Sequence, residues 1–262
     1  MVRVCWCLVG FLCCCITLGS AQSTKQTISM ALQKILKDGK NAKIREAALY
    51  SLANRQDGGG LDILKSVALT DSSTNLQRAA TYAIGNMRET NVSKTLQEIY
   101  SKSSDNKTKE AALYSIANSR SIDAKAFLVE IATTSDDDRM ARTAVYALRN
   151  LSEKGSDGLF LDILKKSKST EVKKAVLYML AESDGKESVK LMSQILKDEE
   201  DPELRLAAVH ALANSHSDDA VDVLVGVVKE GTDKRLRTAA VNALGQIGTE
   251  KARAALIDII EK

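Results

Sequence analysis

Tyrosine and asparagine, two residue types suited to binding a polypeptide, recur at fixed positions in this sequence of 262 residues. Aromatic residues make up only 4% of the chain, yet five of its six tyrosines follow one another at intervals of 32 residues. An asparagine stands four positions after most of these tyrosines. The tyrosine column contains Tyr50, Tyr82, Tyr114, Tyr146 and Tyr178, and continues as His210 and Asn242. The asparagine column contains Asn54, Asn86, Asn118, Asn150 and Asn214, with Glu182 and Gln246 at its other two positions.

The two columns have two interpretations, and the sequence leaves both open. Tyrosine offers a large contact area at low entropic cost together with a hydroxyl group, and asparagine offers a donor and an acceptor to a peptide backbone. The columns therefore predict a binding strip. In the other interpretation, the rings lie flat between neighbouring repeats and the amides cap helix ends, because repeat proteins copy structural and binding positions alike.

Other residue types that carry chemistry do not form a recognisable catalytic or metal site. The two histidines, His210 and His216, stand six positions apart and therefore point to different faces of a helix or into a loop. Gly58–Gly60 is typical of an ordinary turn rather than a phosphate-binding loop. Asp136–Asp138 is best explained as a turn with a helix cap in its middle, since calcium requires more oxygen ligands. We therefore expect a protein that is not an enzyme and that uses no metal and no cofactor.

The first 21 residues differ in composition from the rest and contain all five cysteines. Arg3 is followed by an apolar run from Val4 to Leu18 and then by small residues that end at Ala21, a pattern typical of a secretory signal peptide. We expect cleavage after Ala21 and export to a bacterial periplasm or the extracellular space. An uncleaved anchor is the alternative, although the run is shorter than the about 20 residues of a membrane span. The mature domain would lack cysteine, and with it disulfides and thiolate chemistry.

The charge of the mature chain is nearly balanced. The whole sequence has a formal net charge of +3, and cleavage would leave 36 basic residues (37 less Arg3) and 34 acidic ones. Nucleic-acid binding requires clustered positive charge, so this balance argues against a nucleic-acid partner. We expect a monomer that has no membrane association after cleavage and whose partner is a protein or peptide.

The tyrosines belong to a repeat of 32 residues that covers nearly the whole mature chain without an insertion. Spacings of three and four residues place the apolar positions of each unit on one side of two successive helices. The second helix of the first unit carries Ile44, Ala48 and Leu52, and each of these begins a column. We predict seven two-helix units from about residue 27 to residue 246, then a closing helix from about residue 250 to residue 260.

The turns obey the same period. A residue with a side-chain oxygen opens every second helix and can accept from the free N–H groups of its first turn. These predicted caps are Asn41, Ser73, Asp105, Asp137, Ser169, Asp201 and Asp233. Pro202, the only proline, follows the cap Asp201, where its missing N–H does no harm and its fixed φ suits the helix. The local signals therefore agree with the global period.

The segment Leu236–Gly248, LRTAAVNALGQIG, resembles the second helix of a HEAT repeat, most closely the short type of phycobilisome-lyase-like proteins. Gln77 and Ala141 depart from the basic residue of that pattern, which is otherwise present as Arg45, Lys109, Lys173, Arg205 and Arg237. The resemblance implies an all-α fold, a right-handed α-solenoid of antiparallel two-helix HEAT-like repeats, as one domain over residues 22–262. It also implies that the second helices line a concave surface. The asparagine column is similar to the row with which armadillo proteins hold extended peptides.

These observations together predict an exported HEAT-repeat scaffold that binds other proteins through its concave surface. The same resemblance leaves a lyase or isomerase that acts on a pigment or cofactor as one alternative, and a purely structural spacer is another. Export and the lack of cysteine in the mature domain argue against the lyase or isomerase. A charged column beside the tyrosines is expected to form exposed ion pairs of about 0–1 kcal/mol each. Its members are Glu46, Arg78, Glu110, Arg142 and Lys174.

Overall fold

A computed structural model describes residues 27–55, 59–119, 121–151, 157–181, 186–215 and 217–261 of the chain. Its regular elements are helices, and the described residues contain no strand. The predicted all-α solenoid of two-helix repeats is confirmed. The chain forms two compact units, Met1–Ala124 and Lys125–Lys262.

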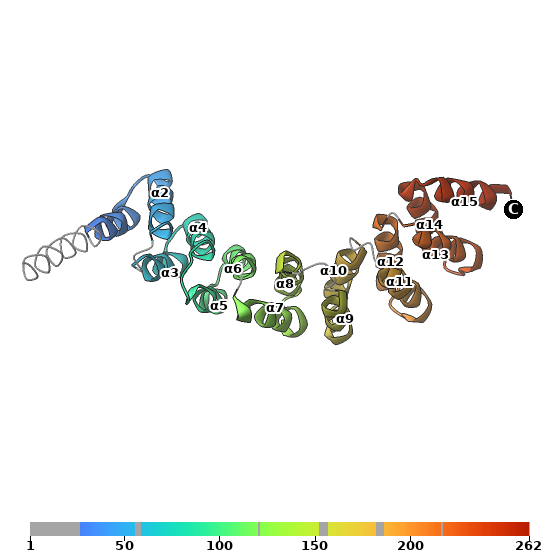
Figure 1. Ribbon diagram of the computed structural model, residues 1–262, viewed down its shortest axis with the longest axis horizontal. Coiled ribbons are helices and arrows are strands. Elements are labelled where there is room, and N and C mark those ends of the chain that lie inside the picture. Colours follow the sequence, from blue (N-terminus) through green and yellow to red (C-terminus); the bar gives the residue numbers. More distant parts are fainter. Residues whose placement is uncertain are drawn as a thin grey trace, which may run out of the picture. The chain divides into compact units, whose positions relative to one another are not determined.

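The first unit contains a helix over residues 27–38 and five helices that follow it. These are α2 (Ala42–Ala53), α3 (Gly60–Thr70), α4 (Thr74–Gly85), α5 (Val92–Lys102) and α6 (Asn106–Asn118). Each first helix packs on the second helix that follows it, α3 on α4 and α5 on α6. Second helices also stack on one another, as α2, α4 and α6 do (Figure 1).

The second unit continues the same pattern. Its first helix, α7 (Ile122–Thr134), begins in the last residues of the first unit. The helices that follow are α8 (Asp138–Leu151), α9 (Asp157–Lys166), α10 (Thr170–Ala181), α11 (Lys186–Asp198), α12 (Pro202–Asn214), α13 (Asp218–Glu230), α14 (Lys234–Ile247) and α15 (Glu250–Glu261). The second helices α8, α10, α12 and α14 stack in that order, and α11, α13 and α15 stack beside them. The predicted closing helix thus matches α15 to within one residue.

Every predicted helix cap is present, which explains why the second helices begin where they do. Side-chain oxygens of all seven residues accept hydrogen bonds from backbone N–H groups two or three positions later. Pro202 is the first residue of α12, directly after the cap Asp201. A capping residue of this kind typically contributes about 1 kcal/mol, so the seven caps fix the register of the repeat.

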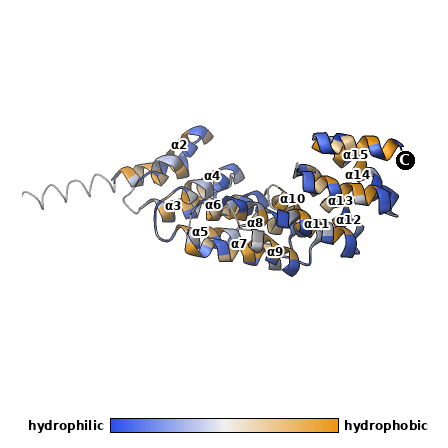
Figure 2. Cartoon of the chain, turned by 45° about the vertical axis from the view of Figure 1, so that its right-hand side comes forward, coloured by the Kyte–Doolittle hydropathy of each residue, from blue (hydrophilic) through white to orange (hydrophobic). Residues whose placement is uncertain are grey.

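The core lies between the helices of each repeat and its neighbours. Hydrophobic and hydrophilic positions alternate around each labelled helix, as amphipathic packing requires (Figure 2). The column of Ala48 is buried in every repeat, and so is the column of Leu52. The column that begins at Ile44 was predicted to face the core, and this prediction is wrong at Ile44 itself. Ile44 is 55% exposed, whereas Leu76 and its later counterparts are buried. The described chain holds no second helix before α2, so this face of Ile44 has no neighbouring repeat to cover it.

Candidate functional site

The tyrosines of the predicted strip lie on successive second helices with their rings partly exposed. Tyr50 on α2 is 43% exposed, Tyr82 on α4 is 41% exposed and Tyr146 on α8 is 38% exposed. Tyr114 on α6 and Tyr178 on α10 are more covered but not buried. Each ring therefore packs one side against the protein and leaves part of its surface to solvent. This geometry combines features of both interpretations of the column, since a ring can support its neighbours and still contact a ligand.

The asparagines lie at or near the C-terminal ends of second helices, four of them on the helices of the tyrosines and Asn214 on α12, and all five are exposed. Asn54 and Asn86 are the C-terminal caps of α2 and α4, through their backbone N–H groups. At the far end of the column, Gln246 Nε2 donates to Asn214 Oδ1 over 3.0 Å, which joins α14 to α12. Among the described contacts, no hydrogen bond is made by the side-chain amides of the other four asparagines. Those amides are therefore available to a ligand.

A network of charges runs beside the strip in the second unit. Glu171 on α10 bonds to Lys174 Nζ over 3.0 Å and lies 3.5 Å from Arg142 Nη1 of α8. Glu203 on α12 lies 2.6 Å from Arg235 Nη1 of α14 and 3.9 Å from Lys174 Nζ. The hydrogen bond to Glu171 raises the pKa of Lys174 above its ordinary value. The expected exposed ion pairs therefore form here, and they join Arg142 and Lys174 to glutamates that stand three positions earlier in the repeat.

Arg142 and Lys174 stand four residues before Tyr146 and Tyr178, so these charges and the rings share one side of each helix. The side continues to α12 and α14, where His210 and Asn242 replace tyrosine. There the two residues line an open depression of about 530 Å³ together with Arg235 and Thr238. The surface of these helices thus offers aromatic, amide and charged groups at matching positions of successive repeats.

The basic column that carried the family resemblance lies on another side of the second helices and is mostly engaged within the repeats. Arg45 Nε donates to the Leu36 carbonyl over 2.6 Å, and Arg237 Nε donates to the Val228 carbonyl over 2.9 Å. Lys109 Nζ lies 5.9 Å from the ring centroid of Tyr100, the one tyrosine outside the strip. Arg205 departs from this pattern because its Nε is buried without a hydrogen-bond partner, which the sequence did not indicate.

The residues considered for catalysis are dispersed. His210 is exposed on α12, and His216 lies outside the described residues. Asp137 is the cap of α8, as expected, through Oδ1 at 2.9 Å from the Arg139 backbone nitrogen. The described part of the chain contains no group of three histidine, cysteine, aspartate or glutamate residues arranged to hold a metal ion. Of the predicted turn Gly58–Gly60, the last two residues are described, and they begin α3.

The predicted signal peptide, residues 1–21, lies outside the described residues, as does Glu182 of the asparagine column. The prediction of cleavage and export therefore stays a prediction. Within the part of the chain that is described, none of the helices has the length and apolar character needed to cross a membrane.

Comparison with known proteins identifies the repeat. The model of the HEAT repeat family matches residues 61–149, 159–241 and 200–262. No curated protein matches the sequence. Among solved structures, human deoxyhypusine hydroxylase in complex with glycerol is similar over 91% of each chain, at 18% identity and a TM-score of 0.43. The complex of CpcE and CpcF of phycocyanin lyase from Nostoc sp. PCC7120 covers 89% of this chain and 93% of its own, at 15% identity and a TM-score of 0.40. YibA of Escherichia coli covers 92% and 96%, at 16% identity and a TM-score of 0.46.

Proposed function

The chain belongs to the HEAT repeat family, and from this premise we propose that it is an exported scaffold that binds a protein or peptide along the strip of tyrosines and asparagines. The second helices carry this strip, on the side that the family resemblance predicts to be concave. The partner is a polypeptide rather than a nucleic acid, the chain acts as a monomer, and it performs no catalysis. Export depends on residues 1–21, whose composition is typical of a signal peptide.

One observation carries the proposal: the same aromatic ring is held partly exposed at the same position of successive helices. Tyr50, Tyr82 and Tyr146 keep about two fifths of their surface in solvent, although burying an aromatic ring is favourable. Partly exposed tyrosines with packed bases supply contact area without much loss of side-chain entropy on binding. The amides of Asn86 and Asn118 then provide the hydrogen-bond donors and acceptors that a peptide backbone requires.

Binding energy usually concentrates in a few central aromatic residues, so we expect Tyr82, Tyr114 and Tyr146 to dominate. The test selects binders for the secreted protein from a library of unstructured peptides and measures their affinity by calorimetry. Replacing all three tyrosines with alanine should weaken binding at least about 100-fold, because a dominant aromatic residue typically contributes 2 kcal/mol or more.

A matched control replaces two exposed lysines on first helices, Lys94 of α5 and Lys190 of α11, with alanine and should leave the affinity unchanged. Circular dichroism shows whether the triple variant remains folded, and a triple Tyr→Phe variant preserves packing if it does not. If the triple alanine variant is folded and binds the selected peptides as tightly as the wild type, the strip is not the binding site. N-terminal sequencing of the secreted protein tests cleavage, which should leave Gln22 first.

A further inference from the structure

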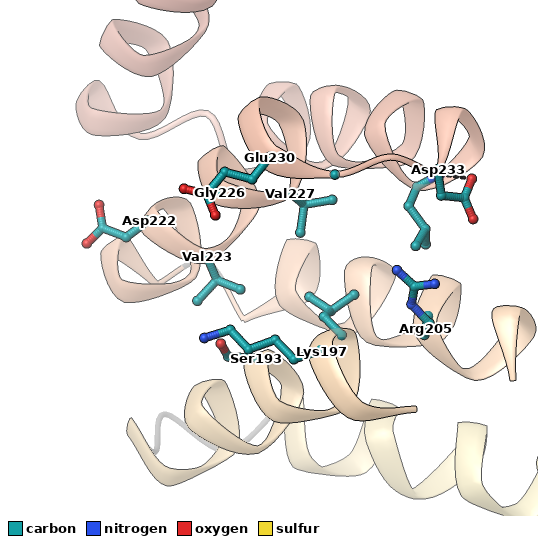
Figure 3. A pocket seen from close by; sticks show the side chains of 12 residues that line it. Ser193, Lys197, Arg205, Asp222, Val223, Gly226, Val227, Glu230 and Asp233 are labelled. Carbon is teal, nitrogen blue, oxygen red and sulfur yellow. Dashed lines mark hydrogen bonds between the residues drawn. The ribbon is translucent and has the colours of Figure 1, made fainter. Parts of the chain in front are cut away.

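A cavity of about 320 Å³ lies in the second unit, on a side of the helices that the strip does not occupy. Its walls come from α11, α12, α13 and α14, and they are partly apolar (Figure 3). The apolar residues are Leu196, Val223, Val227 and Leu236. The volume falls at the lower end of the about 300–1,000 Å³ typical of small-molecule sites.

Arg205 enters this cavity from α12 without the partners that its counterpart has. Arg45 stands five repeat periods earlier and lines a hollow made from the same positions of the repeat. Its Nε donates to the Leu36 carbonyl, and its guanidinium pairs with the carboxylate of Asp71. Arg205 Nε is buried without a hydrogen-bond partner. The residue five periods after Asp71 is Gly231, which has no carboxylate to offer.

The buried Nε of Arg205, which has no partner, is costly to the protein alone. A buried donor without a partner destabilises the fold, and it does so more strongly when the group is charged. Among the described residues, no ion pair engages Arg205. A ligand that supplied the missing acceptor would recover this free energy, and the acceptor that matches a guanidinium best is a carboxylate, which can accept two parallel hydrogen bonds.

The carboxylates already around the cavity are engaged elsewhere or lie away from Arg205. Asp222 pairs with Lys251 Nζ at 2.7 Å. Asp233 accepts from the backbone N–H groups of Arg235 and Leu236 as the cap of α14. Glu230 is exposed, and Figure 3 places Glu230 and Asp222 at the end of the cavity opposite Arg205. Lys197 adds a second positive charge to the lining.

We propose that this cavity binds a carboxylate on a short aliphatic stem, with Arg205 as the anchor of the carboxylate and the apolar wall as the seat of the stem. The carboxylate takes the place that Asp71 fills at Arg45. Arg205 and His210 of the strip are five residues apart, about 140° around α12, so the cavity is distinct from the proposed peptide surface. The ligand is either a free small carboxylate or a carboxylate of a bound polypeptide, since both present the same chemistry.

The experiment follows the Nε–Hε resonances of the arginines by NMR in the full mature protein, with the other arginines as internal references. The first arm titrates hexanoate against hexanamide. The second titrates a tripeptide that ends in a free leucine carboxylate against the same tripeptide with a C-terminal amide. We expect the Arg205 signal to move saturably with one of the two carboxylates. The matching amide should bind at least tenfold more weakly. The arm that responds identifies the source of the ligand.

Substitutions keep the test specific. Arg205→Met should abolish the response while retaining the apolar stem, and Arg205→Lys should weaken it because a lysine cannot form the paired hydrogen bonds. The matched control is Asp71→Gly, which should free Arg45 and create a second site that the wild type lacks. The proposal would be overturned if the Arg205→Met variant bound the carboxylate as tightly as the wild type does. It would also be overturned if the Arg205 signal moved in neither arm. The triple tyrosine variant should bind hexanoate normally, which separates this site from the proposed peptide strip.

Discussion

The hollows at Arg45 and at Arg205 are built from the same positions of the repeat, five periods apart, but only the first is neutralised from within the chain. Leu36 and Lys37 correspond to Leu196 and Lys197, and the two arginines correspond to each other. The difference lies at the residue that follows the first helix of the next repeat. This residue is Asp71 after α3 and Gly231 after α13. The carboxylate of Asp71 thus separates an arginine that is paired inside the fold from one that has no ion-pair partner among the described residues.

The comparison shows how a repeat protein can vary the surroundings of one side chain without changing its architecture. The backbones of Asp71 and Gly231 have nearly the same conformation, with φ of −66° and −69° and ψ of 141° and 133°. Each N–H also bonds to the carbonyl of the valine four residues earlier, over 3.1 Å in both. Only the side chain differs, so substitutions at matched positions isolate its contribution.

The largest effect should come from Asp71→Ala, which leaves the guanidinium of Arg45 unpaired. Only 16% of the Arg45 side chain and 8% of the Asp71 side chain are exposed. We expect a loss of about 2–3 kcal/mol, between the values typical of exposed and of fully buried pairs. Native-state hydrogen exchange of the amides in α2 and α4 measures this loss locally, which suits a repeat array that need not unfold in one step.

Arg205→Met is the matched substitution and should stabilise α12 and α14, by about 1 kcal/mol or more, because it removes a buried donor that has no partner. Equal losses for Asp71→Ala and Arg205→Met would mean that the two arginines are equally engaged. The contrast between the hollows would then be wrong.

A second pair of matched positions, Gly85 of α4 and Gly245 of α14, should respond in opposite directions to alanine. A Cβ at Gly85 would lie 2.6 Å from Ser115 Cβ and 3.1 Å from Ser115 Cα, so α4 and α6 would have to separate. We expect a loss of about 1–2 kcal/mol. A Cβ at Gly245 meets nothing within 4 Å, and alanine there should stabilise α14 by about 0.5–1 kcal/mol. Thermal unfolding of the two variants checks the signs, and a loss at both positions would contradict the matched-position comparison.

Much of the fold could be predicted from the sequence because its signals are local or periodic. Caps such as Ser73 and Asp105 depend on the residue itself and on the next three N–H groups. The buried columns follow from spacing alone. The exposure of Ile44 could not be predicted in this way, and neither could that of Val241, which is 38% exposed while its counterpart Val209 is buried. Burial at those two positions depends on whether a neighbouring repeat covers the face.

The candidate sites divide in the same manner. The period correctly placed the tyrosines of the strip on second helices and its asparagines at or near the ends of second helices, but it could not distinguish Tyr82 from Tyr114, whose exposure depends on the packing around each ring. The Arg205 cavity was missed, although a signal existed. Aligning the repeats by position shows aspartate at 71 and glycine at 231, but only the structure reveals that Asp71 is the partner of Arg45.

The smallest of these effects concerns the caps of the two arginine helices, Asn41 of α2 and Asp201 of α12, again five periods apart. The Thr170 hydroxyl donates to Asp201 Oδ2 over 2.8 Å, and this bond, helped by the N–H groups of Glu203 and Leu204, holds the pKa of Asp201 below its ordinary value. A carboxyl group with a lowered folded-state pKa stabilises the fold fully above the ordinary pKa of about 4 and loses that contribution as the pH falls further.

Asp201→Asn places the residue type of the first cap at α12 and removes the titration. We expect a cost of up to about 1 kcal/mol at pH 7, since asparagine is itself a good cap but cannot bear the charge that Thr170 and the helix N-terminus favour. The difference from the wild type should shrink as the pH falls below about 4, where Asp201 becomes protonated. Hydrogen exchange in the first turns of α12, measured between pH 3 and pH 7, checks the sign. A difference that grows on acidification would show that the carboxylate of Asp201 does not stabilise this helix start.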